Sequence, residues 1–197
     1  EPNMLDWLVE LDKELLLAVN GWNSSFFDPI MVFITNKWSG IPIYAVLLFM
    51  IFYKRNLKVA VLMFFSIIIT FALTDWLGVH LFKRTIERLR PCWDPSVQDL
   101  IRLLEYRGGK FGFISNHAAN FFGLAVISSG VLKKKWYTVF IFCWSAAVAY
   151  SRVYVGKHFP GDVICGAMFG ALVGYLVLLA FRWIIKKYNL PQDAVYK

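Results

Sequence analysis

The sequence predicts an all-α fold: a polytopic membrane helix bundle of about six helices, with an interfacial helix at its N-terminal end. Three observations predict it. Hydrophobic residues make up 58% of the 197 residues, and the mean hydropathy is +0.55, both above what soluble domains show. The apolar residues also gather in runs that approach the roughly 20 residues a helix needs to cross a bilayer.

Five apolar runs are predicted to be membrane helices. They cover residues 41–53, 57–82, 118–132, 136–150 and 163–185, and a weaker apolar piece at 26–34 precedes them. The first and third runs are short for a crossing unless flanking residues extend them. No internal repeat, low-complexity tract or flexible linker interrupts the chain, which favours a single membrane-embedded domain over residues 1–197.

Residues 4–22, MLDWLVELDKELLLAVNGW, alternate apolar and acidic positions at roughly helical spacing. The apolar positions are Leu5, Leu8, Val9, Leu15, Leu16 and Val19, and the acidic ones are Asp6, Glu10, Asp12 and Glu14. This pattern predicts an amphipathic helix that lies in the membrane interface. Glu1, Pro2 and Asn3 precede the first Met, and we expect them to be a remnant outside the fold.

The net charge of +8 raises the question of a nucleic-acid partner. Lys and Arg cluster at the ends of the apolar runs instead of interleaving with aromatic residues on a polar face, so we expect membrane lipids as partners and no nucleic acid. The three cysteines, Cys92, Cys143 and Cys165, are an odd number, and two lie in predicted spans, so no disulfide framework is expected. The sequence leaves the oligomeric state open.

Counting spans places the polar loops on two sides of the membrane. Loops 54–56 and 133–135 and the C-terminal tail fall on one side, and the long segments 83–117 and 151–162 fall on the other. Basic residues are equally numerous on both sides. The first side is predicted to be cytoplasmic for two reasons. Its basic residues are densely clustered in tight loops, and three of the basic residues on the other side are discounted as candidate ligand-binding residues: Lys83, Arg90 and Arg152. The long segments are then expected to be extracytoplasmic.

Three polar segments converge on that second side. In the first, KRTIERLRP (83–91), Lys83 and Arg90 are seven residues apart, which on a helix is two turns along one face. Both side chains then reach toward one anion. The alternative is that they are basic residues flanking a membrane helix, with their charges drawn toward water.

The second segment is FISNHAANFFGLAV (113–126). Ser115 is a good N-cap residue for the apolar run that follows, and Asn116 and His117 would lie in the first turn. Free N–H groups at a helix N-terminus favour an anion, which His117 would touch. The alternative is an ordinary helix cap with a histidine beside it.

The third segment is SRVYVGKHFPGD (151–162). His158 and Asp162 are four residues apart, so in a helical turn the carboxylate would accept a hydrogen bond from one imidazole nitrogen and make the other more nucleophilic. Pro160 suits the first turn of a helix. A capping Asp beside a surface His is the alternative. Taken together with Arg152 and the first two segments, however, these residues form a complete set for phosphoryl transfer.

The order and spacing of these motifs identify a resemblance. K-x6-RP at 83–91, S-x-H at 115–117 and SR-x5-H-x3-D at 151–162 resemble the three-part signature of the type 2 phosphatidic acid phosphatase (PAP2) family, which includes bacterial undecaprenyl-diphosphate and phosphatidylglycerophosphate phosphatases. The resemblance extends over the span pattern from about residue 26 to residue 185. It leaves out the N-terminal helix and the last dozen residues.

The resemblance implies a role for each matched residue. His158 would be the nucleophile that takes the phosphoryl group, oriented by Asp162, and His117 would be the general acid that then activates water. The phosphate oxygens would be held by Lys83, Arg90, Ser115 and Arg152, with backbone N–H groups of Asn116 and His117. No metal and no cofactor is implied. The remaining histidine, His80, also lacks a cluster of Cys, His or carboxylates around it in the sequence.

Two features of the sequence stand apart from the family pattern. The second motif usually reads Pro-Ser-Gly-His, whereas Ile114 and Asn116 replace the Pro and the Gly here, which bears on the size of the pocket and the substrate. Asp75 lies inside a predicted span, where a carboxylate is costly and usually has a partner. An ion pair with Lys83 and a purely structural hydrogen bond are both open.

The sequence therefore predicts a metal-independent lipid phosphatase of a bacterial inner membrane, working through a phosphohistidine intermediate with its site on the extracytoplasmic side. Undecaprenyl diphosphate is the favoured substrate, with phosphatidylglycerophosphate, phosphatidic acid and a lipid A phosphate as the others. A lipid-to-lipid phosphotransferase is the first alternative. A transporter would place polar residues near the bilayer midplane, and a vanadate haloperoxidase would be soluble, so both are less favoured.

Overall fold

The computed structural model describes residues 3–22 and 24–191, and over these residues the fold is all-α, as predicted. The eight α-helices of this part of the chain are α1 (Met4–Asn20), α2 (Phe27–Thr35), α3 (Ile41–Phe52), α4 (Leu57–Leu77), α5 (Arg84–Ile86), α6 (Asn116–Leu132), α7 (Lys135–Tyr154) and α8 (Pro160–Lys187). Short 3₁₀ turns occur at η1 (Lys37–Gly40) and η3 (Pro91–Trp93), and a π-helical stretch, η2 (Gly78–Lys83), continues α4. Leu89 and Phe111 form an isolated antiparallel bridge.

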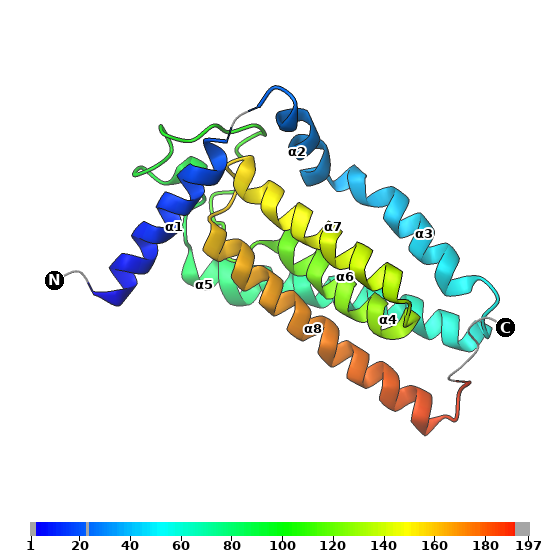
Figure 1. Ribbon diagram of the computed structural model, residues 1–197. Helices are drawn as coiled ribbons and strands as arrows, with labels where there is room; N and C mark the ends of the chain where they lie inside the picture. The colour runs from blue at the N-terminus through cyan, green and yellow to red at the C-terminus, as the bar shows by residue number, and fades with distance from the viewer. Residues whose placement is uncertain (1–2, 23, 192–197) are drawn as a thin grey trace.

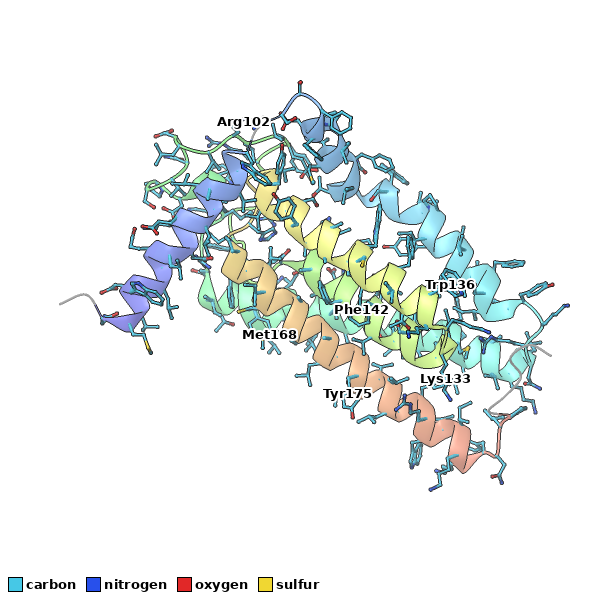
Figure 2. The ribbon with its side chains drawn as sticks, viewed as in Figure 1. Arg102, Lys133, Trp136, Phe142, Met168 and Tyr175 are labelled. Carbon is cyan, nitrogen blue, oxygen red and sulfur yellow. The ribbon has the colours of Figure 1, made fainter. Side chains whose placement is uncertain are left out.

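Helix α6 lies at the centre of the bundle. It packs against α8, α4 and α7, which run alongside it, while α2 packs on α7 and α3 packs mainly on α4 (Figure 1). The inner residues of α6, among them Ala118, Leu124 and Ile127, are completely buried. Large apolar side chains also cover the outside of the bundle, as Met168 and Tyr175 do on α8 (Figure 2). Such an outer surface is suited to lipid.

The connections gather at the two ends of the bundle, as the span count predicts. The α3–α4 and α6–α7 turns and the end of α8 lie at one end. The long segment between α5 and α6 and the α7–α8 connection lie at the other, beside α1 (Figure 1). At this second end Leu104 N donates to Val155 O over 3.3 Å, so the two loops touch each other.

By length and composition, fewer of the described helices could each cross a membrane alone than the five apolar runs that the sequence analysis predicts as spans. Among the described residues, two helical stretches are long and apolar enough to cross a membrane: Leu57–Ile86, with 30 residues, and Pro160–Lys187, with 28. The helix pair Phe27–Thr35 and Trp38–Phe52, bent by 80°, would make a third if it acts as one span. Helix α3 alone has 12 residues, or about 18 Å of helix, which explains why it cannot cross by itself.

Glycines on α8 let the backbone of α6 approach closely. Gly166, Gly170 and Gly174 recur every fourth residue and so lie on one face of the helix. A Cβ added at Gly170 would lie 1.9 Å from the carbonyl oxygen of Ala119, and one added at Gly166 would lie 2.6 Å from that of Ser115. This close packing, typical of small residues between membrane helices, holds the start of α6 against the start of α8.

Helix α1 forms where the sequence predicts it, and its second half docks on the bundle. Leu16 is buried, and the buried Asn20 donates to Tyr154 O over 2.7 Å and to Arg102 O over 2.8 Å. Asn3, one of the three residues expected to be a remnant, is the N-cap of α1, and its side chain accepts a hydrogen bond from Asp6 N over 2.9 Å. The other two residues of that expectation, Glu1 and Pro2, lie outside the described residues.

Candidate active site

A cavity of about 360 Å³ opens at the loop end of the bundle. Its walls come from α2 and η1, from the ends of η2 and α7, from the start of α6 and from the two loops of that end. The lining residues are Thr35, Asn36, Trp38, Lys83, Arg90, Glu105, Tyr106, Gly108, Gly109, Asn116, His117, Arg152, Lys157 and His158. Six of the residues predicted from the sequence are among them: Lys83, Arg90, Asn116, His117, Arg152 and His158. The other three, Asp75, Ser115 and Asp162, lie outside the cavity wall.

Lys83 and Arg90 meet at the cavity, but not through the helix that their spacing predicts. The helix ends at Ile86, Glu87 adopts a left-handed conformation with φ 51°, and Arg90 is extended with φ −71° and ψ 156°. Arg90 is instead held by its backbone N, which donates to Lys110 O over 3.0 Å, and by its Nε, which donates to Phe111 O over 3.2 Å. The loop after Ile86 therefore places Arg90 beside Lys83 at the cavity.

Ser115 is the N-cap of α6, as predicted, but its side chain makes no capping hydrogen bond. Its Oγ is buried without a hydrogen-bond partner among the residues that the structure describes, while its backbone N donates to Asp162 O over 2.9 Å. Next to it, Asn116 Nδ2 donates to Asp75 Oδ1 over 2.7 Å. Of the two roles open for Asp75, the structure therefore contains the hydrogen bond, which joins α4 to the start of α6.

His158 precedes α8 by two residues, and Asp162 lies in its first turn. Pro160 begins the helix, as predicted. His158 Nδ1 lies 3.4 Å from Asp162 Oδ2, in a geometry that does not make a hydrogen bond. Asp162 is fully buried and accepts from Phe159 N over 3.2 Å and from Arg88 Nη1 over 2.9 Å. Asp162 thus stands directly behind His158, although no helical turn joins the two.

Positive charge dominates the cavity. Among its described lining residues, four are cations, Lys83, Arg90, Arg152 and Lys157, and one is a carboxylate, Glu105. Arg152 Nη1 contacts Glu105 Oε2 at 3.3 Å and also donates to Thr35 Oγ1. Burial, followed by repulsion from Arg90 and Arg152, lowers the pKa of Lys157. A bound anion would relieve this crowding of like charges.

The same surroundings keep His158 neutral. Burial lowers the pKa of His158 well below its ordinary value, and the positive charges of Arg152 and Arg90 add to the effect. A neutral imidazole has a free lone pair on one ring nitrogen, so it can attack an electrophile. With Nδ1 facing Asp162, Nε2 is the nitrogen available for that attack.

Several residues of the site are not found by the sequence analysis. Lys157 is next to His158 in the third motif, which is a signal that could have identified it. Glu105 and Thr35 lie far from the motifs and carry no such signal. Gly108, with φ 71°, brings its loop over the cations, since a Cβ there would lie 2.9 Å from Lys157 Nζ and 3.3 Å from Arg90 Nη1.

The donor set of the cavity suits an anion. Lys and Arg side chains donate hydrogen bonds and accept none, and the start of α6 adds the N–H groups of a helix N-terminus. Within residues 3–22 and 24–191, no group of three or more His, Cys, Asp or Glu is arranged to hold a metal ion. A phosphate group fits both the charge and the donors of this site.

Several known proteins resemble this chain in sequence or in fold. Two curated relatives are named lipid A 4′-phosphatase. The one from Bacteroides thetaiotaomicron is 36% identical over 88% of this chain and 78% of the relative. The one from Porphyromonas gingivalis is 32% identical over 98% of this chain and 84% of the relative. The crystal structure of a PAP2-type phosphatidylglycerolphosphate phosphatase from Bacillus subtilis superposes with a TM-score of 0.70 at 24% identity, over 93% of this chain and 90% of that one. The sequence model of the PAP2 superfamily matches residues 57–186, and the chain therefore belongs to that family.

Proposed function

We propose that this protein is a membrane lipid phosphatase that hydrolyses the phosphate ester of a lipid headgroup through a phosphohistidine. One observation carries the proposal: His117 and His158 line one cavity together with four cations. The likeness to membrane PAP2 phosphatases supports it. We further propose that the whole chain acts as one domain, because the cavity draws on residues from Thr35 to His158.

In the proposed reaction, Nε2 of His158 attacks the phosphorus atom in line with the leaving oxygen. The bond from phosphorus to that oxygen breaks, and His117 supplies the proton that the oxygen takes up. Burial and the nearby cations lower the pKa of His117 to about 2 in the empty cavity, and the negative charge of the bound phosphate raises it again, so that His117 carries this proton in the complex. A water molecule, deprotonated by His117, then attacks the phosphohistidine, which releases inorganic phosphate and restores His158. Asp162 orients His158 throughout.

The cations stabilise the transition state in this scheme. Lys83, Arg90 and Arg152 surround the phosphoryl oxygens, where negative charge is spread, and Lys157 adds a fourth charge that the sequence analysis does not assign. The backbone N–H groups of Asn116 and His117 contribute from the start of α6. Fixed donors of this kind are worth about 10²–10³ in kcat each when they contact the developing charge.

We propose a phosphorylated lipid A as the substrate class. The sequence alone favours undecaprenyl diphosphate, but two relatives that are more than 30% identical to this chain are named lipid A 4′-phosphatase. The experiment is phosphate release in detergent from a panel of lipid A phosphate, undecaprenyl diphosphate, phosphatidylglycerophosphate and phosphatidic acid, each with and without a chelator. We expect release from lipid A phosphate that the chelator leaves unchanged.

Variants test the assigned nucleophile. His158→Ala should abolish turnover and also abolish the acid-labile phosphoenzyme trapped by rapid quenching. His80→Ala is the matched control, because His80 is the histidine outside the cavity, with its ring stacked on Trp76 at 4.5 Å. Near-normal turnover of His158→Ala would remove the proposed nucleophile, and no phosphate release from any lipid would end the proposal.

We also propose that the loop end faces the extracytoplasmic side of a bacterial inner membrane. The support is the dense basic clusters in the short loops of the opposite end. A cysteine at Ser96, on the exposed surface of the loop end, should react with an impermeant thiol reagent added outside spheroplasts. Labelling from the cytoplasm alone would reverse the orientation.

A further inference from the structure

Arg88 joins the N-terminal helix to the carboxylate behind His158. Its Nη1 donates to Asp162 Oδ1 over 2.9 Å, and its Nη2 donates to Asp12 Oδ2 on α1 over 2.6 Å. The guanidinium also stacks on the ring of Phe159, 4.3 Å from the ring centre. Arg88 does not line the cavity, so it acts on the site through its neighbours.

Asp12 accepts hydrogen bonds from two groups, the side chain of Arg88 and the backbone of Gly161. While its Oδ2 accepts from Arg88, its Oδ1 accepts from the backbone N of Gly161 over 2.7 Å, in the first turn of α8. The fit is close, since a Cβ added at Gly161 would lie 2.9 Å from Asp12 Oδ2. Asp12 therefore fixes both the arginine fork and the start of the helix that carries Asp162.

The two ion pairs of Arg88, with Asp12 and with Asp162, form a bridge that is more buried than a surface ion pair. The side chain of Asp162 is 0% exposed, that of Asp12 13% and that of Arg88 26%. A buried carboxylate that loses its cationic partner is strongly disfavoured in its charged form. Without Arg88, Asp162 would be a poor acceptor for the Nδ1–H of His158.

We propose that Arg88 and Asp12 are positioning residues that hold Asp162 charged and oriented against His158, which makes the N-terminal helix a working part of the site. This inference rests on the proposed function. It reaches beyond the family motifs, because Asp12 lies outside residues 57–186 that match the superfamily. Arg88 suits the role because its planar fork donates to two carboxylates from two different nitrogens in a fixed geometry, which the single ammonium of a lysine does not provide.

The kinetic test is a double-mutant cycle on Asp12→Asn and Arg88→Gln in the full chain. We expect each to lower kcat by about tenfold or more while KM changes little, because neither residue touches the substrate. The double variant should be no slower than Arg88→Gln alone, since both changes break one bridge. Arg88→Lys should recover only part of kcat. Glu14→Gln, which removes an exposed carboxylate from the same helix, is the control and should match the wild type.

A spectroscopic readout separates this inference from the proposed function. The ¹⁵N shifts of labelled His158 in detergent report which ring nitrogen carries the proton. We expect Nδ1–H in the wild type and a shift toward Nε2–H in Asp12→Asn and Arg88→Gln, whether or not a lipid substrate is turned over. If Arg88→Gln fails to fold, judged by its melting temperature, Asp12→Asn decides the question alone. Unchanged His158 shifts, or independent effects of Asp12 and Arg88 on kcat, would overturn the inference.

Discussion

At His158, burial and positive charge act in the same direction. Both disfavour its protonated form, so the residue proposed as nucleophile stays neutral where a free imidazole would begin to take up a proton. The carboxylate that faces its ring, Asp162, is engaged by Arg88. The position of His158 in the chain predicts its partner but not this balance of charges.

The lowered pKa of His158 predicts how stability depends on pH. The unfolded histidine has a pKa of about 6.5 and the folded one a lower value, so between the two the unfolded state binds more protons. This contribution to stability is constant above about pH 6.5 and is lost as the pH falls below it. The melting temperature in detergent, in a buffer without phosphate, should therefore fall more steeply from pH 7 to 5 for the wild type than for His158→Gln. Parallel curves would contradict the assignment.

At the scale of the elements, the site depends on how α6 meets α8 and α4. The glycines of α8 let the two backbones touch, and this contact brings Ser115 N to Asp162 O. On its other side, α6 is joined to α4 by Asn116 and Asp75. The start of α6 is therefore held by packing on one side and by a hydrogen bond on the other.

Gly170→Ala should destabilise the protein strongly. The added Cβ would meet backbone atoms of Ala119, which cannot rotate away, so we expect a loss of about 3 kcal/mol or more. Gly130→Ala is the control from the same helix pair, because there the Cβ would meet the flexible end of Leu178. Chemical unfolding in mixed micelles measures both. A larger loss for Gly130→Ala would show that the backbone contact is not limiting.

Asp75→Ala should weaken the junction of α4 and α6. It removes the acceptor for Asn116 Nδ2, with an expected cost of about 1 kcal/mol. Asp75→Asn keeps an oxygen acceptor and should lie closer to the wild type. The comparison is made by melting temperature and by KM, because Asn116 also lines the cavity. Identical behaviour of the two variants would rule out the hydrogen bond as the reason.

At the scale of the whole molecule, the cavity is closed by segments that are remote in sequence. Thr35 at the end of α2, Glu105 in the long loop and Arg152 near the end of α7 meet through two hydrogen bonds. An anion bound among the cations would connect these same segments. Ligand binding and global stability are therefore expected to be linked.

Inorganic phosphate should raise the melting temperature. At ten times its dissociation constant a ligand adds about 1.4 kcal/mol of stability, or about 3–6 °C for a chain of this size. Chloride at the same ionic strength should have no such effect, and Arg90→Gln should reduce the shift because Arg90 lines the cavity. An equal rise with chloride would mean that phosphate acts only through ionic strength.

Much of the fold and of the site could be predicted from the sequence. Hydropathy alone indicates the helices, because helix periodicity and apolar run length are local properties. The motif residues Lys83, Arg90, His117, Arg152 and His158 do meet in one cavity. The route differs, however: Arg90 arrives through a loop and not along a helix, since the chain leaves the helix at Ile86. The five apolar runs also outnumber the described helices that are long and apolar enough to cross a membrane alone, because a bent or short helix has the same composition as a straight one.

The sequence by itself determined the membrane class, the helix order and the residues that carry the proposed chemistry. Only the tertiary structure decided which side chains stand around them: Lys157 and Glu105 at the cavity, and Arg88 with Asp12 behind Asp162. The physical reason is distance along the chain. Asp12 and Arg88 are 76 residues apart, and a contact between such remote residues is set by the packing of α1 on the bundle, which no local pattern encodes.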